Sequence, residues 1–336
     1  MRLIRELRQD SKLFVLVVVG IFTAILLGIL IGDKLYTPRS LMSMAYQIPE
    51  FALIAVGMAL AFLTGGIDLS LVANANTSGI FAAMVLKGRW FPGLSEGAAI
   101  LVAILVALVS SMLFGLLNGV IIGKLSAQPM IVTLASMLFI SGIGMALTSG
   151  NAIVGFPDAF TNIGTAHLFG VPVIFIFSMI VILLFGKALS STSTGRRLYL
   201  YGENKTAARF SGFKVERLAM LVYTLTGLFA GLSSIMIISR VNSAKVGYGE
   251  AYLLKALLVC MIGGINPDGG EGKISGVLIT ILIIQLLTDS LTIWELSPYS
   301  KKLIWGAMLL VIMFLNHLYN RYRQKRQLER TVKGVS

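Results

Sequence analysis

Long apolar runs, separated by short clusters of charged residues, glycine and proline, extend along most of the chain. A helix needs about 20 mainly apolar residues to cross the hydrocarbon core of a bilayer. Pro49 and Glu50 interrupt the second run, and the eighth run is short for a straight crossing. We therefore predict an all-α polytopic membrane protein whose ten transmembrane helices form a compact bundle, at Leu13–Ile31, Leu41–Thr64, Ile67–Leu86, Ala98–Gly123, Met130–Thr148, Val171–Leu189, Leu218–Ser239, Ala251–Ile262, Ile274–Thr288 and Leu303–Leu318.

The composition agrees with this pattern. Of the 336 residues, 56% are hydrophobic and only 13% are charged, and this excludes a soluble globular enzyme, a disordered chain and a nucleic-acid-binding domain. Cys260 is the single cysteine, and the two histidines, His167 and His317, lie far apart in the sequence. We expect no intrachain disulfide, no metal site and no cofactor. The first apolar run is too long for a signal peptide, and no small-residue cleavage site follows it.

The net charge of +13 comes mainly from three basic segments. They are the N-terminal segment 1–12, the loop 190–217 and the tail 320–336, which flank or interrupt the membrane domain 13–319. Loops rich in Lys and Arg stay in the cytoplasm, whereas the segment 149–170 has neither and should lie outside. Ten spans with both termini inside satisfy every one of these placements. The basicity is therefore a sign of membrane topology, and we expect no nucleic-acid partner.

Two helices carry glycines four residues apart. Gly115, Gly119 and Gly123 share one helix face, and so do Gly227 and Gly231. Glycine lets helix backbones approach closely in a membrane, so this spacing predicts tight helix packing, with a pore-lining role as the alternative.

The chain shows no motif that would supply energy or catalysis. The glycine-rich stretch 263–273 resembles a nucleotide-binding loop, but Pro267 replaces the first glycine and Ile274 replaces the final Ser or Thr. No HExxH or GxSxG motif is present, and we expect no catalytic residue. Active transport by this chain would need an energy source in another subunit.

One polar break in the apolar pattern follows the second run. Gly65 and Gly66 should stop a helix, and Asp68 or Ser70 should act as the N-cap of the next one. Asn74 and Asn76 then lie inside the third run. The alternative interpretation is that these polar groups line a hydrophilic path.

A second polar segment lies in the middle of the loop 190–217. Residues 202–212 predict a short helix, with Asn204 as its cap, Ala207 and Ala208 as helix formers and Gly212 as its stop. A solvated helix has no need for two alanines and Phe210 on one side. We therefore favour a docking helix for a cytoplasmic partner over an inert surface helix.

Four sequence blocks, listed below in chain order, resemble the permease subunit of ribose-type ABC sugar importers. They cover most of the chain between about residues 40 and 318, although Leu71-Val72 replaces the family's Val-Gly after Ser70. The blocks are Gly66-Ile67-Asp68-Leu69-Ser70; Gly115-Leu116-Leu117-Asn118-Gly119 with Gln128-Pro129-Met130-Ile131-Val132-Thr133-Leu134; Thr194-Gly195-Arg196-Arg197 with Gly202-Glu203-Asn204, Ala207-Ala208 and Ser211-Gly212; and Gly263-Gly264-Ile265 with Gly269-Gly270-Glu271-Gly272.

The resemblance implies a bacterial inner-membrane protein with a fold of the type II ABC importer permease kind. It also implies a second permease chain, identical or paralogous, a cytoplasmic ABC ATPase and an external binding protein for a monosaccharide, such as a pentose, a hexose or an autoinducer-2-like sugar. The ATPase-coupling candidates are Gly202, Glu203, Asn204, Ala207, Ala208, Arg209, Ser211 and Gly212; Thr206 stands where many such motifs have Glu. The substrate-path candidates are Asp68, Ser70, Asn74, Asn76, Asn118, Gln128 and Thr133.

Two other function classes stay open on the sequence alone. An ion-coupled secondary transporter would need charge inside the membrane and often carries internal repeats. The one hint of a repeat is the similarity of residues 65–68, Gly-Gly-Ile-Asp, to residues 263–266, Gly-Gly-Ile-Asn. A membrane enzyme would need a reactive cluster near the interface, and the sequence shows none.

Overall fold

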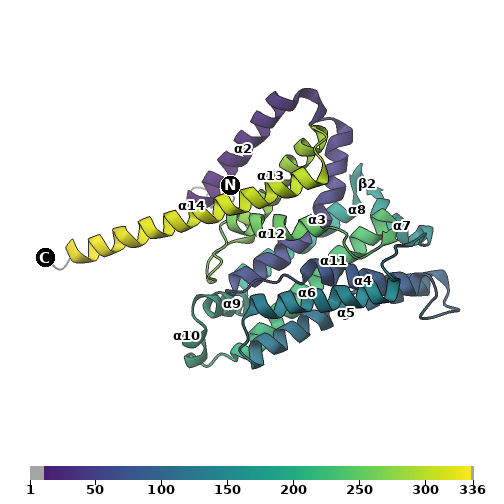
Figure 1. Cartoon of the computed structure of the whole chain (residues 1–336), viewed down its shortest axis with the longest axis horizontal. Helices are drawn as coiled ribbons and strands as arrows, with labels where there is room; N and C mark the ends of the chain where they lie inside the picture. Colours follow the sequence, from purple (N-terminus) through teal and green to yellow (C-terminus); the bar gives the residue numbers. More distant parts are fainter. Residues whose placement is uncertain (1–10, 334–336) are drawn as a thin grey trace.

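The computed structural model describes residues 11–333 and is almost entirely helical (Figure 1). Apolar helices are expected in a bilayer, because the hydrocarbon core offers no water to bond the backbone and a helix satisfies its backbone hydrogen bonds within one segment. The helices are α2 (Ser11–Ile31), η1 (Gly32–Lys34), α3 (Pro38–Leu63), α4 (Leu71–Leu86), α5 (Glu96–Lys124), α6 (Pro129–Thr148), α7 (Asp158–Thr165), α8 (Val173–Ser191), α9 (Ser193–Glu203), α10 (Lys205–Phe210), α11 (Val215–Val241), α12 (Glu250–Ile262), α13 (Ile274–Ile293) and α14 (Pro298–Lys333).

Each of the ten predicted segments coincides with a helix, which confirms the all-α class. Within the described residues, eight of these helices are long and apolar enough to cross a membrane by themselves. The other two, α4 with 16 residues and α12 with 13, are shorter. The number of crossings and the orientation of the termini therefore remain predictions. Helix α14 continues the last predicted segment into the tail as far as Lys333, and residues 1–10 and 334–336 lie outside the described part.

The predicted interruption at Pro49 is wrong, because α3 is one continuous helix with this proline inside it. Helix α3 lies at the centre of the bundle, where 89% of its most apolar window is buried, against 11% for α2 and 6% for α14. The outer helices α2 and α14 therefore present their apolar residues to the surroundings. Figure 1 shows these two helices on one side of the bundle, where α2 packs against α13 and α14 packs against α12.

The glycine spacing has the predicted effect on packing. A methyl group on Gly115 would lie 2.0 Å from the carbonyl oxygen of Tyr223, and one on Gly227 would lie 2.3 Å from that of Ser111. Helices α5 and α11 thus pack backbone to backbone, which is the role predicted for glycine in a membrane.

The two ends of the bundle differ. One end, called the α9 end below, carries α9 and α10 (Figure 1). The opposite end, called the α7 end, carries α7 and two short antiparallel strand pairs. Strand β1 (Ile153–Val154) pairs with β4 (Ser243–Ala244), and β2 (His167–Leu168) pairs with β3 (Val171–Pro172). All strands are two residues long, so they fasten loops rather than build a sheet.

Candidate functional site

The turn between α3 and α4 stops one helix in the predicted way. Gly65 has a φ of +67°, a conformation that glycine adopts without strain. Its amide donates to the carbonyl of Phe62 at 2.9 Å, and the amide of Gly66 donates to that of Ala61 at 3.0 Å. These two bonds satisfy carbonyl groups at the end of α3, as in a Schellman motif.

The Asp68 side chain lies in this turn and is only 2% exposed. Its Oδ1 accepts hydrogen bonds from the backbone amide and the hydroxyl of Ser70, at 3.0 and 2.6 Å, and its Oδ2 accepts one from Thr226 at 2.6 Å. Ser70 occupies the N-cap position of α4 but makes no side-chain cap bond. The predicted N-cap position is therefore confirmed at Ser70, but the side chain makes no cap bond there. Asp68 instead closes the turn before α4 and ties it to α11.

Ser70 extends this network to two further helices. Asn118 on α5 donates to the Ser70 hydroxyl at 3.0 Å, and Ser136 on α6 donates to the Asn118 carbonyl oxygen. Thr133, also on α6, donates to the backbone carbonyl of Ile67 at 3.0 Å. The structure therefore brings four substrate-path candidates together at the junction of α4, α5, α6 and α11.

The remaining path candidates lie apart from this junction. Asn74 and Asn76 are buried in α4 and donate to the backbone carbonyls of Ser111 and Tyr248, each at 3.0 Å. Gln128 is exposed at the start of α6. Six of the seven candidates are thus packed inside this chain, and most of their polar groups are satisfied by neighbouring helices.

The predicted docking helix is two helices, α9 and α10, with Asn204 between them. Gly202 and Glu203 belong to the end of α9, so assigning them to the short helix was wrong. The Asn204 side chain caps α10 by accepting from the Ala207 amide at 2.9 Å, and Gly212, with a φ of +82°, follows its end. The predicted cap and stop are confirmed.

The two alanines of α10 do not share one side. Ala208 is buried against the bundle, whereas Ala207 is exposed and Phe210 is 89% exposed. The Ser211 hydroxyl donates to the Ala207 carbonyl at 2.9 Å, and Arg209 forms an exposed ion pair of 2.8 Å with Glu216. Helix α10 is thus held by local bonds and presents an alanine and a phenylalanine outward.

Helix α9 is anchored through two tyrosines. Tyr199 donates to the carbonyl of Gly272 at 2.8 Å, and burial raises the pKa of its hydroxyl. Burial, helped by the nearby Glu216 carboxylate, raises the pKa of Tyr201 to about 12. Both phenols therefore remain protonated at neutral pH, and Tyr199 can keep its role as a donor.

Three backbone segments meet at the α9 end with no room for side chains. A methyl group on Gly202 would lie 2.0 Å from the carbonyl oxygen of Leu63 and 2.6 Å from the amide of Gly270. That amide donates to the Leu63 carbonyl at 2.9 Å. We call this contact of α9 with the α3–α4 turn and the loop 263–273 the glycine junction. It connects the predicted docking segment directly to the turn that holds Asp68.

A buried ion pair that the sequence does not predict joins α3 and α11. Glu50 on α3 is 1% exposed and accepts from Arg240 of α11, with Nε–Oε1 at 2.5 Å and Nη2–Oε2 at 3.1 Å. Tyr252 of α12 donates to the same carboxylate at 3.0 Å. Lys255 lies nearby, 5.5 to 5.6 Å from the ring centres of Phe51, Tyr252 and Trp305. These charges lie far apart in the sequence, so no local pattern reveals their pairing.

In the described part of the chain, no three His, Cys, Asp or Glu side chains come together as a metal site.

Comparison with known proteins agrees with this description. The family described as branched-chain amino acid transport system / permease component matches residues 40–313. The ribose import permease protein RbsC of Bacillus subtilis is 34% identical over 300 residues, covering 88% of this chain and 90% of the relative. The L-arabinose transport system permease protein AraH of Escherichia coli is 32% identical over 81% of this chain and 80% of the relative. The autoinducer 2 import system permease protein LsrD of Yersinia enterocolitica is 28% identical over 82% of this chain and 84% of the relative.

Proposed function

The chain belongs to the family of branched-chain amino acid transport system permease components, and from this premise we propose that it is the membrane subunit of an ATP-driven monosaccharide importer in the bacterial inner membrane. The observation that carries the proposal is the match over more than four fifths of the chain to permeases named for ribose and arabinose. The substrate class is a ribose-like pentose, a hexose or an autoinducer-2-like sugar.

A partner ATPase supplies the energy in this proposal, because the chain carries no nucleotide-binding motif. Its docking surface is α10, where Ala207 and Phe210 point outward from a helix that is capped at both ends. An exposed phenylalanine on a short loop helix is suited to insertion into a partner. The glycine junction then connects the docking segment to the α3–α4 turn.

A second permease chain, identical or paralogous, completes the translocation path, and a soluble binding protein delivers the sugar at the α7 end. Six path candidates are buried and bonded in this chain, so they contact a sugar only in a conformation in which α4 and the turn before it separate from their hydrogen-bond partners. Gln128 is already exposed. The remainder of the path is formed by helix faces that meet the second chain.

Transport is tested in proteoliposomes that contain the chain with its ATPase and binding protein. We expect ATP-dependent uptake of a labelled sugar of this class from a panel of ribose, arabinose, autoinducer-2 and hexoses. Uptake that is driven by an ion gradient without ATP would contradict the proposal and favour a secondary transporter.

The docking surface is tested by Ala207→Asp. A carboxylate buried without a partner in the contact would cost about 2–5 kcal/mol of association, so the ATPase should no longer co-purify with the tagged permease. Ala152→Asp is the matched control, because Ala152 is also exposed but lies in the segment 149–172, away from α10. Equal co-purification of the ATPase with both variants would show that α10 is not part of the interface.

The orientation is tested by cysteine labelling in a Cys260→Ser background. Thr206→Cys on α10 and Asn162→Cys on α7 are both at exposed positions. An impermeant thiol reagent added to spheroplasts should label position 162 and reach position 206 only after lysis. The reverse pattern would overturn the N-in/C-in topology.

A further inference from the structure

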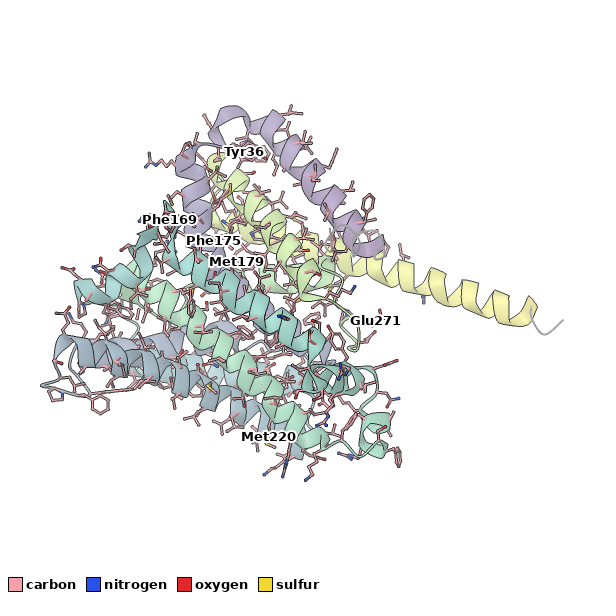
Figure 2. The ribbon with its side chains drawn as sticks, turned by 180° about the vertical axis from the view of Figure 1, so that it is seen from behind. Tyr36, Phe169, Phe175, Met179, Met220 and Glu271 are labelled. Carbon is pink, nitrogen blue, oxygen red and sulfur yellow. The ribbon has the colours of Figure 1, made fainter. Side chains whose placement is uncertain are left out.

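A cavity of about 960 Å³ opens at the α9 end, apart from α10 and from the Asp68 network. It lies between the start of α2, the end of α8, α9, the loop 263–273 and the start of α13. Figure 2 shows Glu271 on this loop, between α2 and the α9 segment. The volume is within the range of ligand sites, about 300–1,000 Å³.

The lining of the cavity changes from polar to apolar along the helices. On α8, Lys187 and Ser190 lie at the end of the helix, while Ile182 and Leu183 lie at least one turn earlier. On α13, Ser275 lies in the first turn and Leu278 follows almost one turn later. Leu183 is 59% exposed on the outer surface of the bundle. One turn corresponds to about 5.4 Å along a helix, so a molecule in the cavity meets charge at one level and hydrocarbon just below it.

The charge at the rim favours an anion. Lys187 and Lys273 come from different elements, and Glu271 supplies the one carboxylate among the described residues of the lining. The start of α13, a helix of 20 residues, also faces the cavity and adds the positive end of its dipole. A ligand with a phosphate at the rim and an apolar tail below it satisfies both parts of the lining.

We propose that this cavity binds an anionic phospholipid, with its phosphate near Lys187 and Lys273 and its acyl chain along Leu183 and Leu278. The assignment to the cytoplasmic leaflet rests on the proposed topology, in which the α9 end is inside. Basic pockets between transmembrane helices on that side bind anionic headgroups in other membrane proteins. The bound lipid would fasten α2, α8 and α13 together beside the glycine junction.

The test is native mass spectrometry of the full-length chain in detergent, titrated with phosphatidylglycerol or phosphatidylethanolamine. We expect wild type to retain phosphatidylglycerol preferentially, and Lys187→Ala/Lys273→Ala to bind it about 30-fold more weakly. Lys34→Ala/Lys124→Ala removes the same charge from two exposed positions outside the cavity and should bind like wild type. Equal retention by all three proteins, or by none of them, overturns the proposal.

Two further arms separate a lipid site from a simple anion site. Leu183→Gln should weaken phosphatidylglycerol binding while leaving the two lysines in place. sn-Glycerol 3-phosphate, which has the phosphate without acyl chains, should fail to displace the lipid. Efficient displacement would show that the lining binds a soluble anion, and an unchanged affinity of Leu183→Gln would show that the chain does not contact α8; either result overturns the site as stated. Because the readout is lipid binding rather than uptake, its failure would leave the transport proposal untouched.

Discussion

The turns after α3 and after α12 both contain Gly-Gly-Ile, at 65–67 and 263–265, and both end their helix with the same backbone pattern, which is set one residue later in the second Gly-Gly-Ile than in the first. Gly65 and Gly264 have φ angles of +67° and +80°. In each turn the next amide, that of Gly66 or Ile265, donates at 3.0 Å to the carbonyl five residues earlier. Asp68 follows Gly65 by three residues and Asn266 follows Gly264 by two, and the Oδ1 of each accepts from the backbone amide two residues later, at 3.0 and 3.1 Å.

The surroundings of the two turns differ. Asp68 is buried and bonded to Thr226 of α11, whereas Asn266 is only partly buried and makes a local bond. A methyl group on Gly65 would lie 3.0 Å from the carbonyl oxygen of Asp268, while one on Gly264 would meet no atom within 4 Å. The same short sequence therefore stops a helix in both places, and tertiary packing decides which turn belongs to the core.

The glycine junction, where the two turns meet α9, should be the most sensitive point of this arrangement. In Gly202→Ala the new methyl group would clash with backbone atoms of Leu63 and Gly270, which cannot rotate away. We expect a loss of about 3 kcal/mol, the upper end for overpacking, and weaker co-purification of the ATPase. Thermal unfolding in detergent and a pull-down measure the two effects.

Gly142→Ala is the control for this prediction, because a methyl group there meets no atom within 4 Å and the site is inside α6. It should be neutral or slightly stabilising. An unfolding midpoint for Gly202→Ala equal to that of the control would mean that α9 is not held tightly against the two turns.

The second-largest difference between the two turns should come from removing the side chains of Asp68 and Asn266, which each accept from the amide two residues later. Asp68→Ala leaves three donors without their acceptor in a buried site and should cost about 1–3 kcal/mol of stability. Asn266→Ala loses one partly solvated local bond and should change stability by no more than about 0.5 kcal/mol. Similar midpoints for the two variants, measured by thermal unfolding, would contradict the assignment of only one turn to the core.

Much of this difference cannot be predicted from the sequence. The helix stops at Gly65 and Gly212, the cap at Asn204 and the glycine packing of α5 are local or periodic signals, and they were predicted correctly. The start of α4 at Ser70 is predicted too, because Asp68 and Ser70 are good caps by residue type, but their bonds to each other and the bond of Asp68 to Thr226 are not.

The long-range contacts cannot be predicted either, because their partners lie far apart in the sequence. Glu50 and Arg240 are 190 positions apart, and each looks like a single interruption in an apolar run. Likewise, nothing local indicates that Gly202 must lack a side chain. That requirement comes from the backbone of Leu63 and Gly270, which the fold brings from two other segments.

Substituting the two stop glycines should give a smaller difference. Gly65→Ala and Gly264→Ala both force an L-residue into the left-handed region, at a cost of roughly 1 kcal/mol each. Only Gly65→Ala also presses a methyl group against the Asp268 carbonyl, and this should add about 1 kcal/mol. Thermal unfolding of the pair measures the difference, and an equal loss would show that the turns do not press on each other.

The smallest effect is expected from exchanging the two side chains, Asp68→Asn and Asn266→Asp. An asparagine at position 68 can still accept both bonds from Ser70, and its amide can donate to the Thr226 hydroxyl, which keeps its own bond to the Tyr223 carbonyl at 2.8 Å. All three contacts survive without the charge, so stability should stay within about 0.5 kcal/mol and uptake should stay near wild type. Asn266→Asp keeps the acceptor oxygen of a partly exposed turn and serves as the matched control. If Asp68→Asn is well expressed and stable but does not transport, while the control does, then the buried charge itself takes part in transport and the turn is more than a structural tie.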